Sequence, residues 1–160
     1  MDERLYAMWV QINRTCFDGQ LEPLSAIGFE ELSGPNGIGA HGKYVLQSKC
    51  IMIDKLFEFS EDDRLAGDDE ALAKAEIACR LMVHEMIHQA LYQHKKPNPG
   101  GHGNSFFDEA QRIANLTGDD APTLETANRW PIHSHFMDAM GRIILNARSA
   151  NESDDSSEKD

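Results

Sequence analysis

Residues 84–88 read His-Glu-Met-Ile-His and lie within the longest helical pattern of the chain, residues 72–94, which holds no Gly or Pro. Side chains four residues apart project from the same side of an α-helix, so the imidazoles of His84 and His88 face one way. Glu85 directly follows the first of them. The pattern is typical of zinc peptidases, in which two histidines hold the metal and the glutamate is the general base. We therefore predict Glu85 as the catalytic residue.

The apolar residues around this motif place it on a buried side of the helix. Ile77, Leu81 and Leu91 share one helical stripe with the two histidines, which is the pattern of a helix that packs on a core. The alternative is an exposed helix with incidental histidines, and it leaves the stripe unexplained. We expect a metal site that is built into the core of the fold.

A catalytic zinc ion takes three protein ligands and keeps one position for water, so a third ligand is expected. His102 follows Pro97, Pro99 and two glycines, which end the helix and turn the chain sharply. A histidine at the tip of such a turn can face back toward the helix. We predict a Zn2+ site whose ligands are His84, His88 and His102.

Two other sources of the third ligand stay open. His94 lies six residues after His88, the metzincin distance, but Leu91 stands where metzincins have glycine. The helix should continue through Leu91 and carry His94 about two turns past His88, away from the metal. A carboxylate from the next helix, Glu109 or the weaker Asp108, is the gluzincin alternative. His102 comes earlier in the chain and lies in a better turn for a ligand.

The rest of the chain predicts an α+β fold, in one domain that spans residues 1–148. Apolar residues at helical spacing predict, besides the motif helix, an N-terminal helix and two later ones, at residues 2–17, 104–118 (capped by Asn104 or Ser105) and 135–148. Strand-like segments at Ala26–Leu32, Ile38–Leu46 and Cys50–Ile53 are separated by turn-like ones. They predict a short antiparallel three-stranded sheet, a meander.

Two segments allow a second interpretation. Gly42 and the two glycines before it weaken or bulge the middle strand, and such glycines let another backbone approach closely, that of a bound peptide included. A phosphate-binding loop would need the Lys-Ser/Thr ending of a P-loop.

The acidic residues 60–70 suit a loop that leads into the motif helix, with Asp68 or Asp69 as its cap. A calcium loop would need the oxygen spacing of an EF-hand.

The chain is acidic throughout. Its 160 residues carry a net charge of -12, and the last eleven, from Ala150 on, hold five acids and one lysine. We predict that residues 149–160 form an acidic disordered tail, because residues 151–160 are rich in Ser and acids and lack apolar side chains. An acidic body disfavours nonspecific binding to DNA or to anionic membranes.

Cysteine use and hydropathy indicate the compartment. Cys16, Cys50 and Cys79 are far apart and odd in number, so we expect reduced core residues instead of a disulfide framework or a zinc ribbon. The N-terminus lacks the pattern of a secretory signal, and no apolar run is long enough to span a membrane. A soluble, cytoplasmic protein is expected.

The spacing of these motifs carries a family resemblance. The His-Glu-x-x-His motif, followed after thirteen residues by His102-Gly103 and then Phe106, resembles the SprT-like, or Spartan-type, zinc metallopeptidase family. Residues 16–21, Cys-Phe-Asp-Gly-Gln-Leu, are similar to that family's Phe-Asn/Asp-x-x-Leu segment, where the first helix meets the sheet. The resemblance covers about residues 8–116. It implies a small α+β zincin with the same three zinc-binding histidines and the same glutamate base.

The resemblance is to the core domain of that family alone. SprT-like proteins generally add a zinc ribbon or basic DNA-binding segments after this core, and this chain has neither four cysteines nor a basic tail. Association with DNA is implied by the resemblance, while the acidic charge disfavours it. The expected partner is a protein or peptide substrate, and a phage or bacterial origin is compatible with a stand-alone core.

Zinc-dependent hydrolysis of peptide bonds is thus the function that the sequence favours. The rival is a noncatalytic zinc-containing module that binds a protein partner, in which His94, His133 or His135 would close the site as a fourth ligand. His133 and His135 would otherwise orient the ligands or cap a helix. His41, in the glycine-rich segment, suits a turn or surface role better than a place in the cleft. The sequence identifies no oxyanion-stabilising group.

Overall fold

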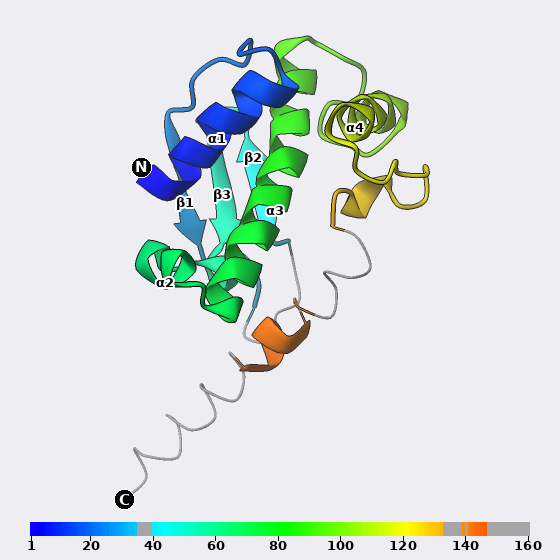
Figure 1. The fold of residues 1–160 in the computed structure, drawn as a ribbon. Helices are drawn as coiled ribbons and strands as arrows, with labels where there is room; N and C mark the ends of the chain where they lie inside the picture. The colour runs from blue at the N-terminus through cyan, green and yellow to red at the C-terminus, as the bar shows by residue number, and fades with distance from the viewer. Residues whose placement is uncertain (35–39, 133–138, 140, 147–160) are drawn as a thin grey trace, which may run out of the picture.

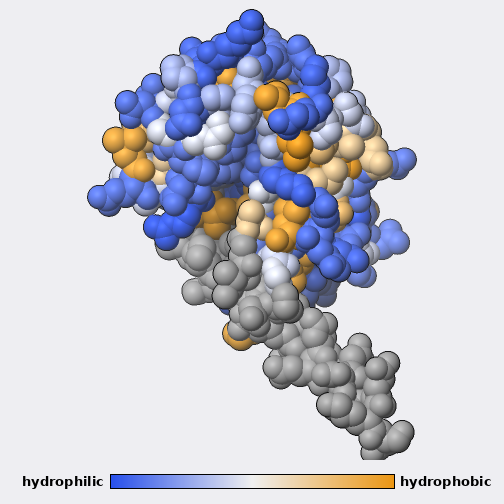
Figure 2. Space-filling model, turned by 180° about the vertical axis from the view of Figure 1, so that it is seen from behind, coloured by the Kyte–Doolittle hydropathy of each residue, from blue (hydrophilic) through white to orange (hydrophobic). Residues whose placement is uncertain are grey.

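The computed structural model describes residues 1–34, 40–132, 139 and 141–146. In this part of the chain a small sheet carries helices α1 (Glu3–Cys16) and α3 (Asp69–Gln93) on one face, and α4 (Asn104–Thr117) packs beside α3 (Figure 1). The surface seen from the opposite side is mostly hydrophilic, with separate hydrophobic patches (Figure 2). The fold is therefore α+β, as the sequence predicted.

Helix α1 follows its sequence pattern closely. The Asp2 carboxylate caps it by accepting the backbone N–H groups of Arg4 and Leu5, at 3.0 and 3.2 Å. Leu5, Trp9 and other apolar residues at helical spacing are buried on its inward side. After the helix Gly19 turns the chain with a φ of +71°, a conformation that favours glycine. Both predicted ends of this helix are confirmed to within one residue.

The sheet differs from the predicted meander. It consists of β1 (Ala26–Glu30), β2 (Gly42–Val45) and β3 (Cys50–Asp54), in the order β1-β3-β2. β2 pairs antiparallel with β3, as expected, but β1 runs parallel to β3 and has no pairing with β2. The prediction of an antiparallel three-stranded sheet is therefore wrong, and the sheet is mixed.

The apolar character of β3 explains its central place. Cys50, Ile51 and Ile53 are buried, and a central strand is the one whose two edges are both covered by neighbours. Eleven residues of sequence separate β1 from β2, whereas the short turn at residues 46–49 joins β2 to β3 as a hairpin. The turn-like composition after β1 indicates a change of direction, but it does not determine which strand becomes the neighbour.

The acidic segment contains more structure than the predicted loop. A 3-10 turn, η1 (Lys55–Phe57), and a short helix, α2 (Glu61–Ala66), follow β3. Asp68 then caps α3, and its carboxylate accepts the backbone N–H of Ala71 at 2.8 Å. Helix α3 is 25 residues long and has His94 as its C-cap, so the predicted extent of the motif helix is confirmed.

Helix α4 has a different N-cap from the one predicted. Gly103 is its N-cap and supplies no side chain, so the expected cap at Asn104 or Ser105 is wrong. The backbone is already helical at Asn104, and the Gly103 carbonyl accepts the first helical bond, from Phe107, at 3.0 Å. The helix ends before Gly118, as expected, and its predicted inward residues are buried.

The C-terminal part is described only in pieces. After α4 comes the 3-10 turn η2 (Ala127–Arg129). Residues 141–146 are helical, and Ile143 is buried, in agreement with part of the predicted last helix. The rest of residues 135–148 and the predicted acidic tail lie outside the described residues.

Buried amide side chains tie the segment after α1 to both long helices. Asn13 donates to the carbonyl of Leu21 and accepts its N–H, at 3.2 and 3.1 Å. On α3, Gln89 accepts the indole N–H of Trp9 at 3.1 Å and donates to the carbonyl of Glu22 at 2.8 Å. These bonds satisfy backbone groups that no strand pairs. They fix α1, α3 and the start of the sheet relative to one another.

The three cysteines are free thiols, as predicted, with Cys16 and Cys50 buried and Cys79 partly buried. Burial raises the pKa of the Cys79 thiol to about 11. Across the described residues, the helices are too short or too polar to cross a membrane.

Candidate metal centre

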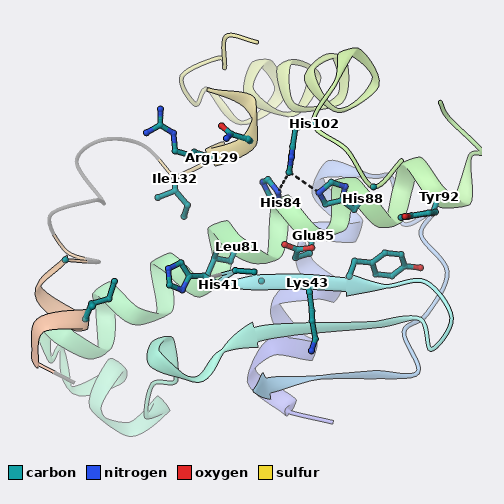
Figure 3. A pocket seen from close by; sticks show the side chains of 17 residues that line it. His41, Lys43, Leu81, His84, Glu85, His88, Tyr92, His102, Arg129 and Ile132 are labelled. Carbon is teal, nitrogen blue, oxygen red and sulfur yellow. Dashed lines mark hydrogen bonds between the residues drawn. The ribbon is translucent and has the colours of Figure 1, made fainter. Parts of the chain in front are cut away.

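Helix α3 sets the positions of two of the three predicted histidines. Its inward side packs on α1, the sheet and α4, and Met82, Met86 and Ile87 are fully buried there. Because interiors are close-packed, the helix cannot turn about its axis without opening the core. His84 and His88 therefore project in a fixed direction, toward His102 (Figure 3).

The turn between α3 and α4 brings His102 back to the helix. Lys95 and Asn98 adopt positive φ values there, at 51° and 47°. Two glycines make the turn tight: a Cβ on Gly100 would lie 2.7 Å from the Tyr92 hydroxyl, and one on Gly101 would lie 2.2 Å from the Asn98 amide nitrogen. The Pro- and Gly-rich composition that predicted this turn thus has a steric cause.

The ring nitrogens of the three histidines converge. His84 Nε2 lies 2.9 Å and His88 Nε2 lies 3.3 Å from His102 Nε2, and one ligand atom from each residue falls within 4.8 Å of the others. Nitrogens around a tetrahedral zinc, with Zn–N distances of about 2.0–2.1 Å, lie about 3.3 Å apart. The three histidines are therefore close enough to bind one metal ion.

The outer ring nitrogens determine which atoms face the centre. His84 Nδ1 lies 2.7 Å from the carbonyl oxygen of Trp130, and His88 Nδ1 lies 2.9 Å from that of Pro99. A carbonyl only accepts, so both Nδ1 atoms carry the hydrogen and a neutral ring keeps its lone pair on Nε2. Both lone pairs face His102 Nε2, which can supply at most one proton. A cation held between the rings resolves this, and carbonyl bonds of this kind are usual behind metal-binding histidines.

Burial favours the neutral form of the three rings. It lowers the pKa of His84 to about 3, with smaller contributions from the positive charge that His88 and His102 would carry. Burial likewise lowers the pKa of His88 and that of His102. Neutral imidazole is the form that binds metal ions. The electrostatics of the cluster therefore suit a cation and disfavour protons.

Glu85 lies on the same turn of α3 and faces the strand β2. Its side chain is buried, and the backbone N–H of Tyr44 donates to the carboxylate. Burial raises the pKa of Glu85 to about 7, and the bond from Tyr44 opposes this shift. Gly42 leaves room for the side chain, because a Cβ there would lie 2.8 Å from Glu85 Oε1. Helix and strand together hold the carboxylate in one place.

These residues line an open cavity of about 680 Å³. Figure 3 shows Leu81 and Ile132 on one side of Glu85 and Tyr92 on the other. The ring of Tyr92 contacts that of Tyr44, with centroids 5.8 Å apart. The cavity thus has apolar walls on both sides of a polar centre, which is the usual composition of a ligand site.

The other candidate ligands lie elsewhere. His94 is exposed and borders a different pocket, and Glu109 borders that pocket too and pairs with Arg112 at 2.6 Å. Within residues 1–34, 40–132, 139 and 141–146, neither joins a group that could hold a metal. His133 and His135 lie outside the described residues.

Sequence reasoning missed several residues of the site. His41 lines the cavity, so the preferred turn or surface role is wrong. The carbonyls of Pro99 and Trp130 and the N–H of Tyr44 are backbone groups, which residue type does not reveal. Gly42 did carry a signal, since the glycine-rich strand predicted a close approach, but the approaching group is the Glu85 side chain.

No protein-family model, no curated protein and no solved structure matches the chain.

Proposed function

We propose that the chain is a zinc-dependent metallopeptidase with a SprT-like zincin core, which hydrolyses peptide bonds of protein substrates. One observation carries the proposal: three histidine Nε2 atoms converge beside the Glu85 carboxylate in an open cavity. Three neutral histidines form a donor set that zinc uses in catalytic sites. The resemblance of the motif spacing to SprT-like proteins supports the same function.

Each side chain has a role in this proposal. His84, His88 and His102 would hold the zinc ion, which when bound supplies Lewis acidity toward water and a peptide carbonyl. Glu85 would accept a proton from water and deliver it to the leaving amine. The hydrogen bond from the Tyr44 N–H would hold the Glu85 carboxylate in one position while the proton moves.

The shape of the cavity supports a peptide as substrate. β2 is an edge strand of the sheet and lines the cavity with Gly42, Lys43 and Tyr44. An extended peptide can lie along such an edge, because its backbone has the same repeat as the strand. The apolar walls beside the polar centre would then contact its side chains.

Replacing Glu85 tests the reaction. We expect Glu85→Gln to bind as much zinc as the parent and to cleave fluorescein-labelled β-casein at least about 100-fold more slowly, since general bases contribute about 10²–10⁴-fold. Zinc is measured by mass spectrometry and cleavage by fluorescence. Glu76→Gln, on the exposed side of the same helix, is the control. Cleavage by Glu85→Gln at the parental rate, or no cleavage by the zinc-loaded parent, would contradict the proposal.

The rival is a noncatalytic zinc-containing module that binds proteins. It requires a fourth protein ligand, and the potential ligands among the described residues number three. His133 and His135, outside that part, are tested by a double change to Asn. Unchanged zinc affinity would favour the peptidase, whereas a tenfold weaker Kd would favour the module.

A further inference from the structure

Asp54 is a buried carboxylate beside the cavity that the proposed reaction does not use. It is only 1% exposed. Its Oδ2 lies 2.9 Å from His41 Nδ1, and its Oδ1 accepts the backbone N–H of Leu56 at 3.2 Å. A carboxylate has no hydrogen to donate, so His41 Nδ1 is the donor. A buried charge is tolerated only with such partners.

These contacts fix the ring of His41. The backbone N–H of Asp54 also donates to the His41 carbonyl, at 2.8 Å. The ring of Phe57 meets the imidazole edge to face, with centroids 5.4 Å apart. Nδ1 is therefore occupied, while Nε2 has no hydrogen-bond partner among the described residues and is left for a ligand.

His41 belongs to the wall of the cavity that holds Glu85 and the three converging histidines. Its neighbour in the chain, Gly42, is the residue that touches Glu85. In Figure 3, His41 lies on the same side of Glu85 as Leu81 and Ile132, opposite Tyr92. A polar ring atom next to apolar side chains of a cavity wall is the kind of group that orients a ligand.

We propose that His41 is a further substrate-binding residue, whose Nε2 atom bonds a peptide group of the substrate while Asp54 holds the ring. A peptide group offers both an N–H and a carbonyl, so Nε2 accepts from it when the ring is neutral and donates to it when the ring carries a second proton. Orientation by a buried Asp is also how the His of catalytic triads is held. This inference rests on the peptidase function proposed above.

Two substitutions separate the two nitrogens of the ring. His41→Asn keeps a donor near the place of Nδ1, and so a partner for Asp54, but removes Nε2. His41→Gln keeps a polar group near the place of Nε2 but leaves the buried carboxylate without its partner. His94→Gln, at the exposed end of α3, is the matched control.

The readouts are Tm, zinc content and kcat/KM on a fluorogenic peptide built around the β-casein bond that the parent cleaves fastest. We expect His41→Asn to keep the parental Tm and zinc content and to lose about tenfold in kcat/KM, the effect of one hydrogen bond to substrate. His41→Gln should have a lower Tm than the parent and a higher kcat/KM than His41→Asn. A purely structural role reverses this order, since activity would then follow stability.

Parental kcat/KM in His41→Asn overturns this inference and leaves the peptidase function intact. No cleavage by the zinc-loaded parent overturns both. If the His41 variants do not fold, the contact between His41 and the peptide is tested in the Glu85→Gln variant, which keeps His41. Saturating this protein with the fluorogenic peptide should shift the Nε2 resonance of His41 but not that of His94, as seen by nitrogen-15 NMR of the rings. An unmoved His41 signal would refute the contact.

Discussion

Gly42 shows how one missing side chain can place a reactive group. A Cβ at this position would lie 2.8 Å from Glu85 Oε1, 3.2 Å from its Cγ and 3.3 Å from its Cδ. Because Glu85 is buried and bonded to the N–H of Tyr44, it cannot move aside without losing that bond. The requirement for glycine here comes from space, not from backbone angles.

The change Gly42→Ala should therefore displace the Glu85 carboxylate. We expect a loss of about 10–100-fold in kcat on β-casein with an unchanged zinc content, since a misplacement of about 1 Å can cost about 100-fold in rate. Gly28→Ala, on β1 at the opposite edge of the sheet, is the control, because its Cβ would meet Met52 Sδ at an ordinary 3.8 Å. Equal kcat values for the two variants would show that Gly42 does not position Glu85.

His41 marks the limit of prediction from single residues. Its partner Asp54 stands thirteen positions further on, and the two meet because β2 and β3 form a hairpin. Neither residue has a neighbour in sequence that indicates the contact. His84 and His88, in contrast, are one helical turn apart, so their common direction follows from spacing alone.

At the scale of elements, the N-cap residue Asp2 makes the stability of α1 depend on pH. Burial acts to raise the pKa of Asp2, but bonds from the Arg4 side chain and the Leu5 N–H outweigh it and hold the pKa below its usual 3.8. The Arg4 guanidinium also bonds Glu58 at 3.2 Å and the carbonyl of Phe59. The cap thus connects α1 with the segment after β3.

We expect Asp2→Ala to lower the free energy of unfolding by about 1 kcal/mol at pH 7, the usual effect of losing an N-cap. Because the folded pKa is depressed, the contribution of Asp2 is complete above pH 3.8 and is lost as pH falls through the folded pKa. Urea unfolding of parent and variant at pH 7, 5 and 3 measures this. Asp2→Asn, which keeps a capping oxygen, should lose less at pH 7. A difference as large at pH 3 as at pH 7 would contradict the assignment.

Helices were predicted more accurately than the sheet because their pattern is local. The spacing of apolar residues, Asp68 as cap and Gly118 as terminator determine α3 and α4 within a few residues of chain. The partner of β1 depends on which strand buries the most apolar surface, and β3 follows β1 by twenty residues or more. Local turn signals therefore gave the right number of strands and the wrong order.

At the scale of the whole molecule, the core does not depend on a metal. A continuous cluster of buried apolar side chains joins α1, the sheet, α3 and α4, and the described part is large enough for a stable core. We expect the metal-free chain to remain folded and zinc at about 100 times its Kd to raise Tm by about 5–10 °C. Circular dichroism during heating measures the shift. His102→Ala should reduce it, and an unfolded metal-free chain would show that the metal is structural.

The acidic charge predicts weak contact with nucleic acid. With a net charge of -12, the chain should show no binding to fluorescein-labelled single- or double-stranded DNA in 0.1 M NaCl at micromolar protein, and DNA should not accelerate β-casein cleavage. Phosphate binding requires clusters of Lys and Arg, and this chain has few of these residues. Fluorescence anisotropy tests binding. A Kd below about 1 μM would reveal a basic groove that the overall charge conceals.

The site as a whole was predictable in its side chains and not in its backbone contacts. The motif spacing and the Pro- and Gly-rich turn indicate three histidines and a glutamate before any fold is known. The carbonyls of Trp130 and Pro99, which orient two of those rings, come from segments whose path depends on the complete packing. Reasoning from residue types thus recovers the converging side chains but misses the backbone groups that hold them.

The strand order β1-β3-β2 has one further consequence, for self-association. A sheet edge with unpaired backbone groups can template pairing with another chain. Here the Ile27 carbonyl of β1 accepts the N–H of Asp2 at 2.8 Å, and the Tyr44 N–H of β2 is bonded to Glu85. Each edge thus has a backbone group already engaged by its own chain. The arrangement that holds Glu85 therefore removes one donor from the edge of β2, and a chain that adds there, a substrate peptide or a second copy, must pair with the backbone groups that remain.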